Sequence, residues 1–164
     1  MEQWRVIDEF SDYSVSDEGR VRNEETGRVL AQRMNTTGVI YVGLQRGRRQ
    51  HCRSVPLLVA REFLPPHGNS NFDTPINLDG DKWNNRPENL MWRPRWFALK
   101  YRLQFHAPPK GFRHPVVEIE TGVTFPTSWD AAIKYGLLDL DILVATINRT
   151  FVWPTGQSFR VMYR

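Results

Sequence analysis

Short runs of β-prone residues, each closed by a turn, fill the first third of the chain and most restrict what it can fold into. The run YSVSDEGRVRN turns at residues 17–19, and the run GVIYVGLQRGRRQHCRSV turns at Gly47, which stands between arginines. Apolar and β-branched residues interrupted by glycine turns are typical of antiparallel hairpins. We therefore expect an antiparallel β module over residues 1–53.

The next segment changes to helix and loop signals. VPLLVAREFL, residues 55–64, is compact and apolar, and Pro56 is tolerated in a first helical turn. These residues predict a helix of about two turns. PPHGNSNFDTP, residues 65–75, has the composition of a loop, whereas RPRWFALKYRLQFH places basic and apolar residues at helical spacing. This spacing predicts a second helix near Pro94 to Phe105.

Prolines and a glycine in APPKGFRHP, residues 107–115, indicate a linker. Beyond it, VVEIETGVTF predicts a strand pair. Thr127 or Ser128 can cap a helix that Gly136 ends, a second helix is expected over residues 139–148, and QSFRVMY predicts a last strand. This order outlines a helix-turn-helix module.

The predicted fold class is α+β, and the element order suggests four segments. They are an N-terminal antiparallel β module (1–53), a central core with its following helix (54–106), a linker (107–114) and a helix-turn-helix module (115–164).

Basic side chains gather in two places, although the net charge of +4 is modest. Residues 1–34 carry eight acidic and five basic side chains, and the two basic groups follow later in the chain. Either group could bind the phosphates of double-stranded DNA, or could simply be a solvated hairpin tip and helix face. The candidate phosphate-binding residues are Arg46, Arg48, Arg49, Arg53, Arg95, Lys100, Arg102, Lys110 and Arg113.

Composition also restricts the compartment. Cys52 is the only cysteine, which excludes an intrachain disulfide and a cysteine zinc site and fits a reducing compartment. No apolar run approaches the roughly 20 residues of a membrane span, and the acidic start MEQWRVIDEF lacks the features of a signal peptide. We expect a soluble, cytoplasmic protein.

Three consecutive blocks resemble the intron-encoded HNH homing endonucleases of bacteriophages. They are EQWRVIDEFSDYSVSDEGRVRNEETGRVL, then VAREFLP with INLDGDKWNNRPENLMW, and VVEIETGVTFPTSWDAAIKYGL. The resemblance implies a β module, a ββα-metal (HNH) core built around one cation, and a C-terminal helix-turn-helix, laid along a duplex inside an infected bacterial cell. Members of that family nick or cut long, degenerate DNA targets.

The family's catalytic positions fall on unsuitable residues in this chain. By the resemblance, one metal ligand stands at Ile76, the general-base histidine at Asn77 and the remaining ligand at Ala98, while a further usual histidine falls on Pro56. Isoleucine and alanine offer a cation no oxygen, and an asparagine amide does not accept a proton from water near neutrality. We therefore predict a DNA-binding protein that does not cleave and needs no cofactor.

One alternative hypothesis, placed after a protein-binding role, retains nuclease activity through a relocated metal site. Asp79 and Asp81 are the carboxylates nearest to the empty positions and could recruit a divalent cation such as Mg²⁺. The alternative is an ordinary turn at Asp79-Gly80 with a charged loop. Three asparagines match structural residues of the family and are expected to satisfy backbone groups and brace this loop against the helix, namely Asn84, Asn85 and Asn89.

The last predicted helix supports the first alternative to DNA binding, in which the inherited scaffold binds a protein, such as host machinery or a virion component. DLDILVATINRT opens with two acids and is otherwise mostly apolar, which suits a protein partner better than a phosphate backbone. Its candidate surface residues are Asp139, Asp141, Val144 and Asn148.

Overall fold

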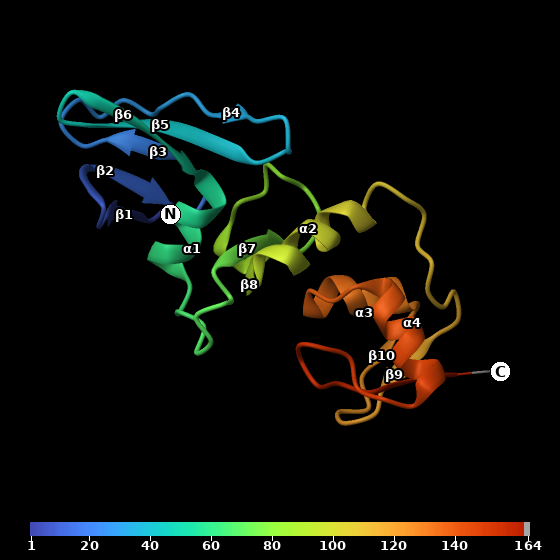
Figure 1. Cartoon of the computed structure of the whole chain (residues 1–164). Helices are drawn as coiled ribbons and strands as arrows, with labels where there is room; N and C mark the ends of the chain where they lie inside the picture. Colours follow the sequence, from blue (N-terminus) through green and yellow to red (C-terminus); the bar gives the residue numbers. More distant parts are fainter. Residues whose placement is uncertain (163–164) are drawn as a thin grey trace. The chain divides into compact units, whose positions relative to one another are not determined.

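The computed structural model describes residues 1–162, which form two compact units, residues 1–95 and residues 96 onward. The structure is a mixed α+β fold with antiparallel sheets and four α-helices within the described part of the chain (Figure 1). This confirms the predicted fold class. The division into two units does not decide between the four finer segments, which stay a prediction. No helix among these residues combines the length and hydropathy needed to cross a bilayer.

The first unit is built from two three-stranded antiparallel sheets, one helix and a hairpin. One sheet has the order β1 (Trp4–Ile7), β2 (Phe10–Ser16) and β3 (Val21–Asn23), and the other has the order β4 (Arg33–Met34), β5 (Ile40–Arg46) and β6 (Arg49–Ser54). The predicted turn at Gly47 is confirmed, since this glycine has φ 62° between β5 and β6. The predicted β signals of residues 4–53 are therefore confirmed.

Helix α1 (Val55–Phe63) occupies the centre of the first unit, where it contacts strands of both sheets and the hairpin of β7 (Thr74–Asn77) and β8 (Leu90–Arg93) (Figure 1). Its start is as predicted, with Pro56 in the first turn. Val55, Leu58 and Val59 recur at helical spacing and are buried in one core with residues from both sheets. That shared core fixes α1, and through it the β7–β8 hairpin, against the β module.

The loop predicted for residues 65–75 ends earlier than expected, because Thr74 and Pro75 already belong to β7. Pro75 stands opposite Trp92, near the start of a two-stranded pair. A proline is tolerated near the start of a strand that has a free edge. Pro75 was therefore not evidence that the loop continues to residue 75. A 3-10 turn, Pro87–Asn89, leads into β8.

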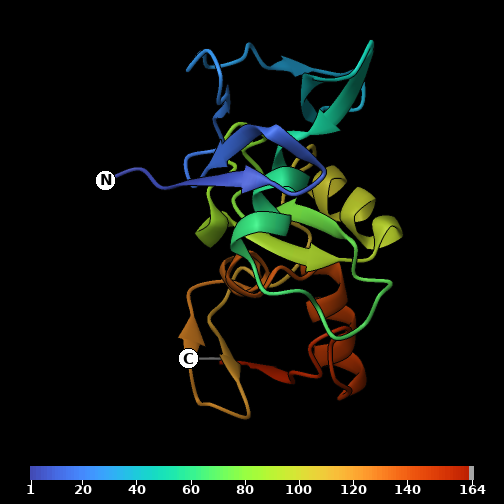
Figure 2. The same cartoon turned by 90° about the vertical axis from the view of Figure 1, so that its left-hand side faces the viewer.

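Helix α2 (Arg95–Gln104) is close to the predicted 94–105, and all of it after Arg95 belongs to the second unit. A small antiparallel sheet of order β10 (Thr124–Phe125), β9 (Val116–Glu118) and β11 (Phe159–Val161) packs against two helices, with α3 beside β10 and α4 beside β11 (Figure 2). Strand β11 is shorter than predicted, and Tyr163, the end of the predicted strand, lies outside the described residues.

Helices α3 (Ser128–Tyr135) and α4 (Asp139–Asn148) match the predicted bounds. Thr127 caps α3 in a reciprocal capping box with Asp130, and Gly136 ends it with φ 60°, a left-handed conformation that glycine adopts without a Cβ penalty. Local capping residues therefore account for both ends of α3, whereas α4 begins at Leu138 without a side-chain cap.

Candidate functional site

Ile76 and Asn77 lie at the end of β7, opposite Met91 and Leu90 of β8. The Ile76 side chain is only 2% exposed, so it packs as an aliphatic core residue. A carboxylate at this buried position would need a cation or donors to offset its desolvation, whereas isoleucine needs neither.

The amide of Asn77 serves as a brace. Its Nδ2 donates to the carbonyl oxygen of Asn84 and to Oδ1 of Asn85, both at 2.9 Å. Asn85 is buried and donates in turn to the carbonyl oxygen of Lys82 at 3.1 Å. Both N–H groups of Asn77 are therefore occupied in holding the loop that follows β7.

The turn predicted at Asp79-Gly80 is confirmed. Oδ1 of Asp79 accepts from the Asp81 amide at 2.9 Å and from Asn89 Nδ2 at 2.8 Å, while Oδ2 accepts from Asn84 Nδ2 at 2.7 Å. Gly80 has φ 77° and its amide donates to the Asn77 carbonyl at 3.0 Å. The asparagine amides close this loop as predicted, whereas their bracing of the loop against the helix stays a prediction.

These bonds bear on the hypothesis of a relocated metal. Both oxygens of Asp79 already accept hydrogen bonds, and Oδ1 of Asp81 accepts from the Trp83 amide at 2.9 Å. Within residues 1–162, no three His, Cys, Asp or Glu side chains are grouped so that they could hold a metal ion. The relocated site stays a prediction, and the observed bonds favour a loop-forming role for Asp79.

Ala98 lies on α2 in the second unit and is 3% exposed. Its methyl group has no lone pair. Neither residue that the resemblance places at a metal-ligand position fits a divalent cation, because the buried Ile76 and the buried Ala98 offer no oxygen.

The first basic group surrounds the β5–β6 hairpin. Arg53 forms an ion pair with Glu9, which holds the pKa of that carboxyl below its usual value, and its guanidinium lies 4.9 Å from the centre of the Phe10 ring. Arg46 lies over the same ring and donates to the Glu9 carbonyl at 3.4 Å. These two arginines are thus engaged within the first unit.

Arg48 and Arg49 stand at the exposed tip of the hairpin, and Arg49 is directly opposite Arg46 across the two strands. In the described part of the chain neither Arg48 nor Arg49 has an ion-pair partner. Like charges placed opposite each other in a sheet are destabilising unless an anion offsets them.

The second basic group follows α2 and the linker. Arg95, Lys100, Lys110 and Arg113 are exposed, while Arg102 is half-buried. Lys100 lies 5.3 Å from the centre of the Trp96 ring. The backbone amide of Lys110 donates a hydrogen bond to the Asp139 carboxylate, whereas its side chain is exposed.

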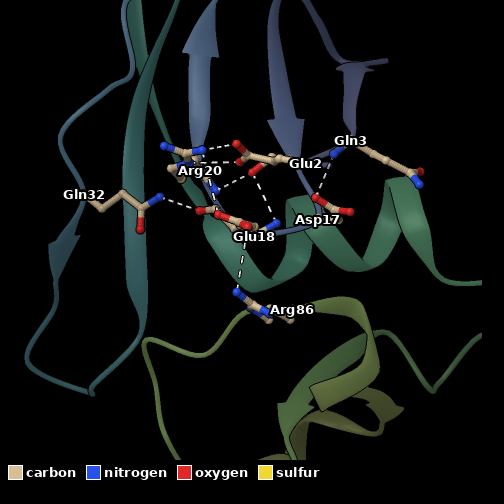
Figure 3. Close-up of polar contacts among 9 residues, drawn as sticks. Glu2, Gln3, Asp17, Glu18, Arg20, Gln32 and Arg86 are labelled. Carbon is tan, nitrogen blue, oxygen red and sulfur yellow. Dashed lines mark hydrogen bonds and ion pairs between the residues drawn. The ribbon is translucent and has the colours of Figure 1, made fainter.

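Sequence reasoning missed a polar cluster that joins the β module to the loop before β8 (Figure 3). Arg20 pairs with Glu2 and lowers the pKa of that carboxyl, and Glu18 Oε1 lies 3.8 Å from Arg86 Nη2. The backbones also approach closely here, since a Cβ on Gly19 would lie 3.0 Å from Cβ of Asn85. No local pattern could reveal this contact, because its partners are far apart in sequence.

Asp139 is not a surface residue, so its predicted place on a protein-binding surface is wrong. It is 3% exposed, and its carboxylate accepts from the amides of Lys110 and Gly111 and from the Ser128 hydroxyl, at 2.9, 2.7 and 2.6 Å. The acid at the start of α4 therefore fixes the linker.

The other members of that predicted surface are accessible. Asp141 is half-buried, while Val144 and Asn148 are exposed. Burial raises the pKa of Asp141, and the positive charge of Lys100 opposes this shift.

Comparisons with known proteins point to one group of nucleases. Residues 2–45 match the NUMOD4 motif. Two curated relatives from Acanthamoeba polyphaga mimivirus, the uncharacterized HNH endonucleases L245 and L247, are 32% and 33% identical over 90 and 94 residues. Those matches cover 55% and 56% of this chain but only 26% and 23% of the relatives, so the chain spans about a quarter of their length.

A solved structure described as "DNA binding and cleavage by the HNH homing endonuclease I-HmuI" superimposes with a TM-score of 0.54. The alignment covers 99% of both chains at 22% sequence identity. The chain therefore has the fold of an HNH homing endonuclease and is similar in sequence to HNH endonucleases.

Proposed function

We propose that this chain is a double-stranded DNA-binding protein derived from a phage-type HNH homing endonuclease, and that it does not cleave the DNA it binds. The observation that carries the proposal is the loop after β7, which is closed by hydrogen bonds around Asn77 at the position of the family's general base. The similarity in fold and sequence to HNH endonucleases supports the choice of DNA as partner.

Hydrolysis of a phosphodiester needs a base to activate water and a cation to stabilise charge on the phosphate. The Asn77 amide nitrogen is not basic, and both of its N–H groups donate hydrogen bonds within the loop. Loss of a general base costs about 10²–10⁴ in rate. Because Ile76 and Ala98 cannot hold the cation either, the chain lacks both requirements.

Binding needs less than catalysis does. Beyond the short pairing of β4 with Ile40 and Tyr41, the β5–β6 hairpin continues to its tip as a two-stranded ribbon, a shape that the major groove of B-DNA admits. The guanidinium groups of Arg48 and Arg49 at its tip, which have no ion-pair partner among the described residues, can each bind a phosphate. A phosphate bound between the side chains of Arg46 and Arg49 would also relieve the repulsion between them.

The binding half of the proposal is tested by the salt dependence of affinity for a labelled duplex. Each phosphate contact contributes a slope of about −0.9 to log K against log salt, so Arg48→Ala with Arg49→Ala should reduce the slope by about 1.8. Between 50 and 200 mM salt, this corresponds to about a 12-fold smaller loss of affinity. A control that removes two exposed charges elsewhere, Arg28→Ala with Arg160→Ala, should change the slope far less. Equal slopes in the tip variant and the parent would refute DNA binding by the hairpin.

The catalytic half is tested with supercoiled plasmid and Mg²⁺ or Mn²⁺. The natural protein should leave the plasmid intact. Ile76→Asp, Asn77→His and Ala98→Asn together should restore some metal-dependent nicking, while any one alone restores little, because ligands and base act as a unit. Since Asp at a buried position is costly, circular dichroism must show that the triple variant is folded.

EDTA-sensitive nicking by the natural protein would contradict the proposal. If Asp81→Asn then abolished the activity, the nuclease hypothesis with a relocated metal at Asp79 and Asp81 would replace it.

A further inference from the structure

Most of the large apolar side chains that the protein exposes belong to the second unit. On α4, Leu140, Val144 and Ile147 are 48%, 47% and 66% exposed and recur at i, i+4 and i+7, which places them on one face of the helix. Contact with water does not favour three aliphatic side chains on one face of a helix. Contiguous exposed apolar surfaces of this kind mark interaction sites.

A cavity of about 340 Å³ opens beside this stripe. Its walls are mainly apolar and come from the end of α2, the linker and the starts of α3 and α4, with Leu103, Pro108, Trp129 and Leu140 among the lining residues. Leu140 belongs to both the stripe and the cavity, and Leu103 extends the apolar surface onto α2, where it is 57% exposed. The stripe and the cavity therefore form one surface, which we call the α4 groove.

Charge at the edge of the α4 groove restricts what it can bind. Lys100 and Lys110 line the cavity and are exposed, whereas the single accessible carboxylate, Asp141, is half-buried. The other acid at the start of α4, Asp139, is fully occupied with the linker. The edge is thus more basic than acidic and is complementary to an acidic flank on a partner.

Nucleic acid is a poor occupant of this surface. Residues 139–148 contain no lysine or arginine, and a phosphate backbone would gain nothing from three exposed aliphatic side chains. A helix that presents apolar side chains at i, i+4 and i+7 would fill the groove in the helix-in-groove manner and insert one side chain into the cavity.

We propose that the α4 groove binds an amphipathic α-helix of a protein partner, whose apolar face covers Leu140, Val144 and Ile147 and whose acidic flank meets Lys100 and Lys110. The helix buries the exposed stripe, and its carboxylates pair with the two ammonium groups. This binding does not depend on the DNA-binding hairpin, which lies in the first unit.

The test uses the full chain and a displayed library of helix-forming 16-residue peptides. Selected peptides should repeat apolar residues at i, i+4 and i+7 and carry an excess of Asp and Glu. Their affinity is then measured by fluorescence anisotropy. Val144→Asp should weaken binding by about tenfold or more, as expected for a central apolar contact.

Two further variants make the test specific. Val123→Asp changes an equally exposed valine that lies outside the α4 stripe and the cavity, and it should alter affinity by less than about twofold. Lys110→Glu should weaken binding of the acidic peptides and favour peptides with basic flanks.

Several outcomes would overturn the proposal. They are a library that yields no helical consensus, peptides with basic flanks selected by the natural protein, equal losses in Val123→Asp and Val144→Asp, and a dimer in sedimentation that Val144→Asp dissociates. The last outcome would assign the groove to a second copy of the chain. A parallel loss of duplex affinity in Val144→Asp would instead assign it to DNA.

Discussion

Removal of the Asp139 carboxylate should destabilise the second unit more than any surface change nearby. The side chain is 3% exposed and accepts three hydrogen bonds, two from backbone amides of the linker and one from Ser128. The Asp139 amide itself donates to Gln104 at the end of α2 at 3.1 Å. One residue therefore connects α2, the linker, α3 and α4.

The magnitude follows from these bonds. A hydrogen bond to a charged group contributes roughly 1.5–3 kcal/mol, so three at the lower end sum to about 4.5 kcal/mol. Relaxation and entry of water reduce this, and we expect Asp139→Ala to lower the free energy of unfolding by about 3–4 kcal/mol. Asp139→Asn keeps one oxygen for the two amides and offers N–H to the Ser128 hydroxyl, so it should cost only about 1 kcal/mol.

Differential scanning calorimetry and tryptophan fluorescence measure this loss. In a unit of 60–100 residues, 1 kcal/mol shifts Tm by about 4–8 °C, so Asp139→Ala should lower the Tm of the second unit by about 12 °C or more. Asp141→Ala is the matched control, because its carboxylate is only half-buried, and it should stay within about 0.5 kcal/mol of the parent. A loss below about 1 kcal/mol in Asp139→Ala, or an equal loss in the control, would refute this reasoning.

Three further predictions concern stability. Gly111→Ala should destabilise the second unit, because the added Cβ would collide with the Asp139 carboxylate, and combination with Asp139→Ala should cost less than the sum of the two; additive losses in urea denaturation would contradict this. Tyr135 donates to Glu118 at 2.5 Å, which raises the pKa of Tyr135 to about 12 from 10.0. The neutral phenol is thus favoured by folding, its stabilisation is fully present below pH 10.0 and is lost as the pH rises towards 12, and Tyr135→Phe should show a smaller fall of unfolding free energy over that window. Asn89→Ala should cost about 2–3 kcal/mol, because this buried amide makes three hydrogen bonds that close the β7–β8 loop, and unchanged thermal unfolding would show that the loop is not braced there.

Elements governed by local chemistry could be predicted from sequence. The capping box of Thr127, the left-handed Gly136 and the hairpin turn at Gly47 each depend on residues within a few positions, so their consequences could be read without the fold. The brace around Asp79 is similar, since its partners lie within ten positions along the chain.

Contacts between distant segments could not be predicted in this way. Arg53 was assigned to DNA because its neighbours are basic, yet it pairs with Glu9, 44 positions earlier. Asp139 was assigned to a protein-binding surface because two acids on an otherwise apolar helix suit a protein partner better than a phosphate backbone, and only the path of the linker, 28 and 29 positions earlier, shows that it is buried. In both cases charge and helix position were judged correctly, but the partner was set by tertiary packing.

Under the proposed function, the residues at the positions assigned by resemblance to the metal and the base explain how the scaffold can remain folded without a cation. A carboxylate at position 76 would be desolvated and would rely on a bound cation, whereas Ile76 contributes apolar burial in the same space. A histidine at position 77 would have to remain free to act as a base, whereas Asn77 adds two hydrogen bonds to the loop. Ile76 and Asn77 thus stabilise the folded chain without a bound cation, whereas a carboxylate and a free histidine at these positions would not. Among the described residues, the β5–β6 hairpin takes no part in these contacts, so the DNA binding that we propose for it does not require the catalytic groups.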